Sequence, residues 1–277
     1  MKSESRRYPY GDQPSQFADL VLPEGNGPFP VAILVHGGFW KNRISLDIMS
    51  PMVADLTARG IATWNIEYRR VGEEGGGWPG TFQDVARATD HLREVARNNR
   101  LDLNRVLVVG HSAGGQIGLW LAARHLLPDD NVLKTSDHPL DIKTVVSLAG
   151  VCDLALMEAT HRMRISEMRG AVSDNPVYDL LEGTPFEVPE RYAFASPIQL
   201  LSVQSEQILI HGGCDLNVPI GISHSYYNAA MIAGAPVELI EIQNAEHFKV
   251  INPRSDCWPI IARAILQAAE LPARKMQ

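Results

Sequence analysis

Apolar and polar residues follow two kinds of pattern along the chain: segments with an apolar run or strict alternation predict strands, and segments with apolar residues at helical spacing predict helices. Residues 31–36 (VAILVH) form a continuous apolar run, which is typical of a strand covered on both faces. Residues 17–23 alternate apolar with polar side chains, as a strand with one solvated face does. The predicted strands cover residues 17–23, 31–36, 61–69, 105–110, 144–150, 207–212 and 237–243. The predicted helices cover residues 46–60, 81–99, 114–126, 223–234 and 257–270.

This alternation predicts an α/β fold with a mostly parallel central sheet and helices on both faces, because strands joined through helices pair in parallel. No helix separates residues 17–23 from residues 31–36, so we expect an antiparallel edge there. Residues 1–16 are polar and are expected on the surface. Residues 151–200 break the rhythm with short helical pieces, which predicts either a small lid-like insertion over the carboxyl ends of the strands or a longer crossover. We predict a single domain over residues 1–277.

Composition narrows the class of protein. The 277 residues are 45% hydrophobic, which is enough for a substantial packed core. A net charge of −7 argues against a nucleic-acid-binding surface, which needs clustered positive charge. An odd, sparse set of cysteines (Cys152, Cys214 and Cys257) does not predict a disulfide framework. Neither a secretory signal nor an apolar segment of about 20 residues is visible, so we expect a cytoplasmic protein without a membrane partner.

One serine stands at an abrupt turn. Residues 110–114 (GHSAG) fit the pattern G-x-S-x-G and lie between a predicted strand and a predicted helix, which is the context that a nucleophilic serine of this motif requires. A turn this sharp puts strained dihedrals on Ser112 and leaves room only for small residues such as Gly110 and Gly114 two positions away. The alternative is that Ser112 is an ordinary helix N-cap.

A second turn offers backbone N–H groups. Residues 36–40 (HGGFW) directly follow the buried strand 31–36, and the paired glycines let the backbone swing toward the centre of the sheet. The amides of Gly38, Phe39 and Ala113 are the predicted oxyanion-hole donors, since Ala113 opens a helix whose first N–H groups have no helical acceptor. An ordinary glycine turn at residues 36–40 is the alternative.

A serine hydroxyl needs a base, and nine histidines compete for this role. His247 lies on a loop just past the last predicted strand, where a carboxyl strand end would place it near Ser112. His111 adjoins the serine but is expected to point away on so tight a turn. His36 and His211 each end a predicted strand and are expected to brace loops through hydrogen bonds. We therefore predict His247 as the base.

An acid should orient the imidazole of the base. Asp215 comes directly after the predicted strand 207–212, which gives the chain order Ser, Asp, His. Asp153, after the preceding predicted strand, is the alternative candidate for the acid. Glu246 adjoins His247 in the chain but is expected to face away from it. The predicted catalytic set is therefore Ser112, Asp215 and His247.

The motifs HGGFW, EYRRVG, GGGWPGTFQDV, GHSAGG, HGGCDLNVP and EHF, taken in this order, resemble the α/β-hydrolase superfamily. The resemblance covers about residues 17–270 and is strongest to the small esterase branch, which includes kynurenine formamidase-like and acetyl- or feruloyl-esterase-like enzymes. It implies the same nucleophile, acid, base and amide donors. One position departs from the pattern: hormone-sensitive-lipase-like relatives carry a third glycine where this chain has Phe39. The oxyanion hole is therefore expected to use slightly different amides from those of these relatives.

These features predict a serine hydrolase that cleaves a small carboxylic ester or an aryl amide or formamide through an acyl-enzyme intermediate. The alternatives are an exopeptidase of the dipeptidyl-peptidase-like type and a non-catalytic hydrolase-fold binding protein. We expect no metal and no organic cofactor, because no Cys/His cluster has ligand spacing and no G-x-G-x-x-G follows a strand. The expected partner is the small-molecule substrate rather than nucleic acid or a membrane, and a homodimer is the assembly to test.

Four side chains near the predicted site are candidate substrate contacts: Trp40, Tyr68, Trp78 and His111. Trp40 is the last residue of the turn 36–40, called the oxyanion turn below, where an apolar leaving-group pocket would lie. Tyr68 ends a predicted strand, and a structural hydrogen bond is the alternative for its hydroxyl. Trp78 either walls the pocket or anchors its own glycine-rich loop.

Overall fold

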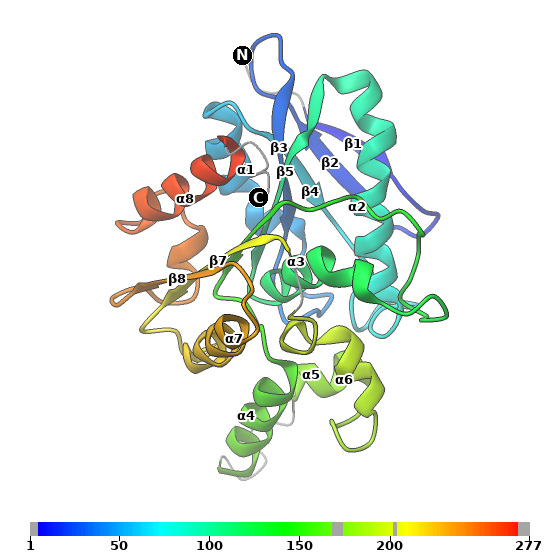
Figure 1. Cartoon of the computed structure of the whole chain (residues 1–277), viewed down its shortest axis with the longest axis vertical. Helices are drawn as coiled ribbons and strands as arrows, with labels where there is room; N and C mark the ends of the chain where they lie inside the picture. Colours follow the sequence, from blue (N-terminus) through cyan, green and yellow to red (C-terminus); the bar gives the residue numbers. More distant parts are fainter. Residues whose placement is uncertain (1–4, 168–173, 202–203, 271–277) are drawn as a thin grey trace.

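A single twisted sheet organises the molecule in the computed structural model, which describes residues 5–167, 174–201 and 204–270. Within these residues the sheet has eight strands in the order β1-β2-β4-β3-β5-β6-β7-β8 (Figure 1). In chain order the strands are β1 (Ser5–Pro9), β2 (Phe17–Val21), β3 (Phe29–Val35), β4 (Ala62–Ile66), β5 (Leu101–His111), β6 (Thr144–Leu148), β7 (Glu206–Gly212) and β8 (Val237–Ile242).

The direction of pairing changes at one edge of the sheet. β1 pairs with β2 and β2 with β4 in antiparallel fashion, whereas the strands from β4 to β8 pair in parallel. The predicted antiparallel edge is therefore confirmed. β1 is an additional strand that the hydrophobic pattern does not reveal, because almost all of its residues are exposed and no apolar face marks it. The first four residues of the predicted surface segment 1–16 lie outside the described residues.

Helices cover both faces of the sheet, as the alternation of elements predicts. The α-helices are α1 (Ser50–Ala58), α2 (Gly80–Asn99), α3 (Ala113–Ala123), α4 (Leu154–Glu167), α5 (Pro176–Leu181), α6 (Pro189–Ala195), α7 (Gly221–Ile232) and α8 (Trp258–Glu270), and short 3-10 turns are η1 (Leu46–Met49), η2 (Arg124–Leu126), η3 (Pro197–Gln199) and η4 (Lys249–Ile251). Helices α2, α3 and α7 pack on one face of the sheet, and α1 and α8 pack on the other (Figure 1).

Two apolar cores result from this layering, one on each face of the sheet. Helix α2 shows how the sequence specifies its face: an apolar stripe at helical spacing turns toward the strands and is buried. The buried residues of that stripe are Phe82, Val85, Ala86, Leu92 and Val95. On the opposite face, Met52 and Leu56 of α1 join Ile261 and Ile265 of α8. Both faces of the parallel strands are thus covered, which explains their continuous apolar runs.

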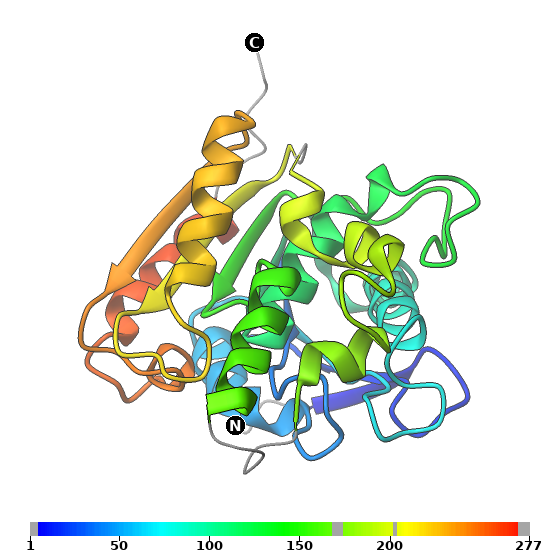
Figure 2. The same ribbon diagram turned by 90° about the horizontal axis from the view of Figure 1, so that it is seen from below.

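Helices α4, α5 and α6 interrupt the alternation between β6 and β7, in the segment predicted as an insertion. Figure 2, seen from below, shows α4 in front of the sheet, beside α5 and α6. α4 contacts the turn that follows β3 through His161 and the loop that follows β7 through Arg164. These contacts place α4 over the carboxyl ends of the strands. Residues 168–173 of the predicted insertion lie outside the described residues.

No helix among the described residues combines the length and the apolar character that a membrane crossing would need.

Candidate active site

The serine turn between β5 and α3 is sharp and strained, as its sequence predicts. Ser112 has φ 56° and ψ −119°, a conformation that residues other than glycine rarely adopt. A Cβ atom at Gly110 would overlap the carbonyl oxygen of Gly114, and a Cβ atom at Gly114 would overlap the carbonyl oxygen of Val35. Glycine is therefore required on both sides of the serine so that the chain can turn.

Backbone hydrogen bonds hold this strained turn in place. The N–H of Ser112 donates to the carbonyl oxygen of Leu148 across 2.8 Å, which ties the turn to the end of β6. The Ser112 carbonyl oxygen accepts from the N–H groups of Gly115 and Gln116 and so begins the hydrogen bonding of α3. The side chain of Ser112 is thereby fixed at the junction of β5, β6 and α3.

The turn after β3 lies against the serine. A Cβ atom at Gly37 would stand 2.8 Å from the Cβ atom of Ser112, so only glycine permits this approach. Gly38 and Phe39 follow with φ values of 111° and 52°, which turn the backbone sharply. Within the described ranges, the N–H groups of Gly38, Phe39 and Ala113 have no hydrogen-bond acceptor. Unpaired donors on the two segments that meet at Ser112 can stabilise an oxyanion.

A buried polar cluster holds the end of β3. The carboxylate of Glu67 accepts from His36 Nε2 across 2.9 Å and from the N–H of Leu46 across 3.0 Å. The ring of Tyr68 stacks on that of His36 with centroids 4.5 Å apart, and its hydroxyl donates to the His36 carbonyl oxygen. Burial acts to raise the pKa of Glu67, but its interaction with His36, the hydrogen bond from the Leu46 N–H and the charge of nearby Arg70 hold it below its usual range. The cluster therefore fixes the strand end from which the oxyanion turn departs.

The predicted acid and base are in direct contact. His247 Nδ1 donates to Asp215 Oδ2 across 2.6 Å. Asp215 Oδ1 accepts from the N–H groups of Asn217 and Val218 at 2.8 and 2.9 Å, which anchors the carboxylate to its own loop. Burial acts to raise the pKa of Asp215, yet hydrogen bonds from His211, His247 and the backbone hold it well below its usual range. The carboxylate is therefore ionised and orients His247 with Nε2 free to accept a proton.

His247, the predicted base, lies beside the serine turn. His111, the neighbour of Ser112, donates from Nε2 to the backbone carbonyl oxygen of His247 across 3.0 Å, and the two rings are 4.6 Å apart. The hydroxyl of Ser112 makes no hydrogen bond to any group in the described part of the chain. Hydrogen bonds between nucleophile and base often tighten only when substrate binds. The structure therefore places Asp215 and His247 beside the turn that carries Ser112, and the Ser112 hydroxyl has no hydrogen-bond partner among the described residues.

The other candidate acids have different partners. Asp153 accepts from the N–H of Leu156 and from the hydroxyl of Ser225, so it caps α4 and ties it to α7. Glu246 is exposed and accepts from the N–H of Phe248. His211 braces the loop between β7 and α7 that carries Asp215, called the acid loop below, as its place at a strand end predicts; it donates from Nε2 to the carbonyl oxygen of Val218.

Three predicted substrate contacts have internal partners instead of an open surface. Trp40 is fully buried and donates from Nε1 to the side-chain oxygen of Gln116 across 3.1 Å. The buried hydroxyl of Tyr68 bonds to His36, and the buried ring of His111 bonds to His247. Their substrate-binding role stays a prediction, and these contacts favour a bracing role for all three.

Trp78, the fourth candidate, anchors its loop to the insertion. Its backbone N–H donates to the carbonyl oxygen of Leu180 in α5 across 2.9 Å. The guanidinium of Arg191 in α6 lies 5.8 Å from the centroid of its ring. Its ring also contacts Phe82 of α2 edge-on. Of the two alternatives for this tryptophan, these contacts favour the anchor.

Polar links that no sequence motif marks join the insertion to the site. Lys41, directly after the oxyanion turn, pairs through Nζ with Asp174 and with Asp179 of α5, the latter at 2.8 Å. Arg164 of α4 donates to the carbonyl oxygen of Leu216 across 3.1 Å, next in the chain to Asp215, the predicted acid. Lys41 could have been noticed from its place after HGGFW, but its partners are 133 and 138 residues away and no local pattern marks them.

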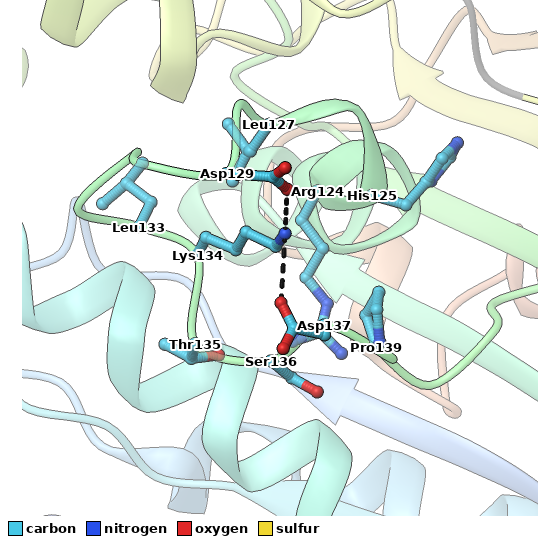
Figure 3. Close-up of a pocket in the computed structure, with 10 residues that line it drawn as sticks. All are labelled: Arg124, His125, Leu127, Asp129, Leu133, Lys134, Thr135, Ser136, Asp137 and Pro139. Atoms are coloured by element: carbon cyan, nitrogen blue, oxygen red, sulfur yellow. Dashed lines mark hydrogen bonds and ion pairs between the residues drawn. The ribbon is translucent and has the colours of Figure 1, made fainter.

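A separate pocket lies in the loop after η2 and shares no residue with the site (Figure 3). The ammonium group of Lys134 lies between the carboxylates of Asp129 and Asp137, and Arg124 is paired with Asp90. The two cationic side chains that line this pocket, Lys134 and Arg124, are thus already paired with carboxylates of the fold.

Comparisons with known proteins agree with this architecture. A family model described as BD-FAE matches residues 18–229. Esterase LipC of Mycobacterium tuberculosis is 26% identical over 246 residues, which are 87% of this chain and 59% of that protein. Kynurenine formamidase of Danio rerio is 22% identical over 270 residues, which are 94% of this chain and 80% of that protein. The chain spans between 50% and 59% of the length of the curated relatives LipC, the methylesterase ICME of Arabidopsis thaliana and LipQ.

Solved structures match over almost the whole chain. A truncated carbohydrate esterase from gut microbiota superposes with a TM-score of 0.77 at 22% identity, covering 97% of both chains. Esterase B from Lactobacillus rhamnosis superposes with a TM-score of 0.78 at 19% identity, covering 96% of this chain and 86% of that one. At this level of identity the likeness concerns the fold, and it confirms the fold class that the sequence predicts.

Proposed function

The chain belongs to the α/β-hydrolase family that the BD-FAE model describes, and on this premise we propose that it is a serine hydrolase of small carboxylic esters. The observation that carries the proposal is the 2.6 Å contact between His247 and Asp215 beside the strained turn of Ser112. Esterases among the relatives and among the superposed structures support the same class of reaction.

The proposed reaction proceeds through an acyl-enzyme. Ser112 Oγ attacks the ester carbonyl carbon while His247 Nε2 takes the hydroxyl proton. The unpaired N–H groups of Gly38, Phe39 and Ala113 bind the negative oxygen of the tetrahedral intermediate, and the N-terminal end of α3 adds favourable electrostatic potential. Protonated His247 then gives its proton to the leaving alcohol. Water, activated by the same imidazole, hydrolyses the acyl-enzyme and restores the serine.

Aryl formamides are the second candidate substrate class. The relative that supports them is a kynurenine formamidase, of which the chain spans 80%. The same residues would perform both reactions, because the amide differs from the ester only in its leaving group. An exopeptidase ranks lower, since the acylamino-acid-releasing enzymes matched by the chain are covered over only 28% and 33% of their length. A non-catalytic binding protein ranks lowest, because each role in the site has an occupant.

Covalent labelling tests the proposal directly. A fluorophosphonate should label the protein at Ser112, and the Ser112→Ala variant should neither be labelled nor turn over substrate. A panel of short acyl esters, aryl formamides and peptide amides then ranks the substrate classes by kcat/KM. Full turnover by the Ser112→Ala variant would refute the assignment of the nucleophile, and a preference for peptide amides would refute the esterase assignment.

We propose a cytoplasmic location for the protein. All three cysteines are free, and Cys214 is exposed, which suits a reducing compartment. Fractionation of cells that express the full-length protein tests this, and recovery in a secreted or membrane fraction would contradict it.

A further inference from the structure

Helix α4 bridges the two loops that carry the proposed chemistry. The ring of His161 meets that of Phe39 edge-on, with centroids 5.3 Å apart and an interplanar angle of 81°. One turn further, Arg164 donates to the carbonyl oxygens of Leu216 and Asn217 at 3.1 and 3.3 Å. Positions three apart share one face of a helix, so the same face of α4 spans from the oxyanion turn to the acid loop.

The side chain of His161 has a ring nitrogen without a hydrogen-bond partner. Its Nε2 is buried and has no hydrogen-bond partner among the described residues. A buried polar atom left unpaired is costly, and its presence in a folded protein calls for an explanation. Neither the packing of α4 nor the proposed mechanism uses this nitrogen.

The imidazole of His161 is neutral near pH 7. Burial lowers its pKa to about 4, helped by the positive charges of Arg164 and Lys41 and opposed by Asp174. A neutral imidazole presents one N–H donor and one bare acceptor nitrogen. The nearby positive charges are also occupied, because Lys41 pairs with Asp174 and Asp179 and Arg164 bonds to carbonyl oxygens. The partner that suits this position is therefore uncharged.

Resting on the proposed serine-hydrolase function, we propose that His161 is a specificity-determining residue that hydrogen-bonds a hydroxyl group of the ester substrate beside the ring of Phe39. A hydroxyl group both donates and accepts, so it fits His161 Nε2 in either tautomer. A purely alkyl ester would leave Nε2 unpaired, and sites built around such a bond discriminate against analogues that lack the group. The favoured substrates are thus hydroxylated esters, such as those of polyols or hydroxy acids.

Matched ester pairs measure this selectivity. Glycerol 1-monoacetate against propyl acetate varies the hydroxyl groups of the alcohol, and methyl 3-hydroxybutyrate against methyl butyrate varies those of the acyl chain. In the His161→Phe variant we expect kcat/KM for the hydroxylated member of one pair to fall about 10- to 100-fold, the range of a lost buried hydrogen bond. The unhydroxylated member should change less than about 3-fold. The pair that responds identifies the side of the ester that carries the hydroxyl.

Two further variants separate recognition from folding. His161→Asn keeps a hydrogen-bonding group and should recover part of the selectivity, and His138→Phe, on an exposed loop, should leave both pairs unchanged. His161→Leu replaces the phenylalanine variant if thermal unfolding shows that the latter is not folded. Equal changes in both members of each pair, or no change in either pair, would overturn the proposal and leave His161 a structural residue.

A binding measurement keeps this inference distinct from the proposed reaction. NMR titration of the Ser112→Ala variant with glycerol 1-monoacetate, propyl acetate and the two methyl esters gives dissociation constants without turnover. A hydroxyl preference that disappears when His161→Phe is added supports the role of His161 even if the wild-type protein hydrolyses none of the four esters, an outcome that would defeat only the proposed function. Equal affinities within both pairs would defeat the role of His161.

Discussion

His111 donates a hydrogen bond from Nε2 to the backbone carbonyl oxygen of His247 across 3.0 Å. The residue before the proposed nucleophile thereby holds the loop of the proposed base. Because a carbonyl oxygen can only accept, Nε2 carries the proton and Nδ1 is a bare nitrogen, which is buried without a partner among the described residues. His111 is therefore a positioning residue that acts through His247.

Loss of this hydrogen bond should impair turnover more than substrate affinity. In a His111→Phe variant the carbonyl of His247 loses its donor, and we expect kcat to fall about 10-fold while KM stays within about 3-fold. His111→Gln, whose amide can donate to the same carbonyl, should recover part of the loss. His125→Phe, at an exposed position on η2, is the matched control. Steady-state kinetics on a short acyl ester would contradict the role if KM alone changed.

The same residue should make the protein less stable in acid. Burial, and secondarily the neighbouring imidazole of His247, lower the pKa of His111 to about 3, whereas its unfolded value is about 6.5. A depressed folded-state pKa means that the unfolded chain takes up the proton first. The contribution to stability is therefore present above about pH 6.5 and is lost as the pH falls toward 3. The free energy of unfolding, measured by urea denaturation across this window, should depend less steeply on pH in His111→Phe than in the wild type; parallel curves would contradict this.

Gly114, two positions after the serine, should tolerate no side chain. In Gly114→Ala the new Cβ atom overlaps the carbonyl oxygen of Val35, which is backbone and cannot move aside without shifting β3. We expect a loss of about 3 kcal/mol or more in the free energy of unfolding. Gly221→Ala at the start of α7 is the control, because nothing lies within 4 Å of its added Cβ atom, and it should change stability by less than about 1 kcal/mol. Equal effects in thermal denaturation would refute the steric explanation.

The ion pairs of Lys41 should matter to activity more than to stability. Asp174 and Asp179 are each more than a third exposed, so Lys41→Met should cost less than about 1 kcal/mol of stability. The lysine nevertheless ties the oxyanion turn to the insertion, and we expect kcat/KM to fall about 5-fold. Added salt should reduce the wild-type rate toward that of the variant. Lys143→Met, which breaks an exposed pair with Asp141, is the control and should leave the rate and its salt dependence unchanged.

Local chemistry explains why much of the site could be predicted. The serine turn and the oxyanion turn depend on glycines within a few residues of Ser112 and Phe39, so the sequence carries their steric requirements directly. Asp215 and His247 follow strands whose parallel pairing brings their ends together. Position along the chain was a poorer guide to side-chain direction, because Trp40 and Tyr68 adjoin the site in sequence but turn into the core.

Long-range contacts explain what could not be predicted. The pairing of Lys41 with α5, and of Arg164 with the loop after β7, joins residues far apart in the chain and leaves no local signature. The edge strand β1 was missed because its exposed residues carry no apolar alternation. β5 begins at Leu101, earlier than predicted. Its first half escaped prediction because Asp102 and Asn104 interrupt the apolar run, which marks only the buried second half of the strand.

The two outer strands of the sheet also bear on association. β1 offers Arg6, Arg7 and Pro9 along its exposed length, and proline has no N–H with which to extend a ladder. At the opposite rim, β8 exposes Glu238 and Glu241. Charge of one sign on each rim penalises pairing of β1 with β1 and of β8 with β8, so crowding at high concentration should not drive two molecules to join through the same edge of the sheet.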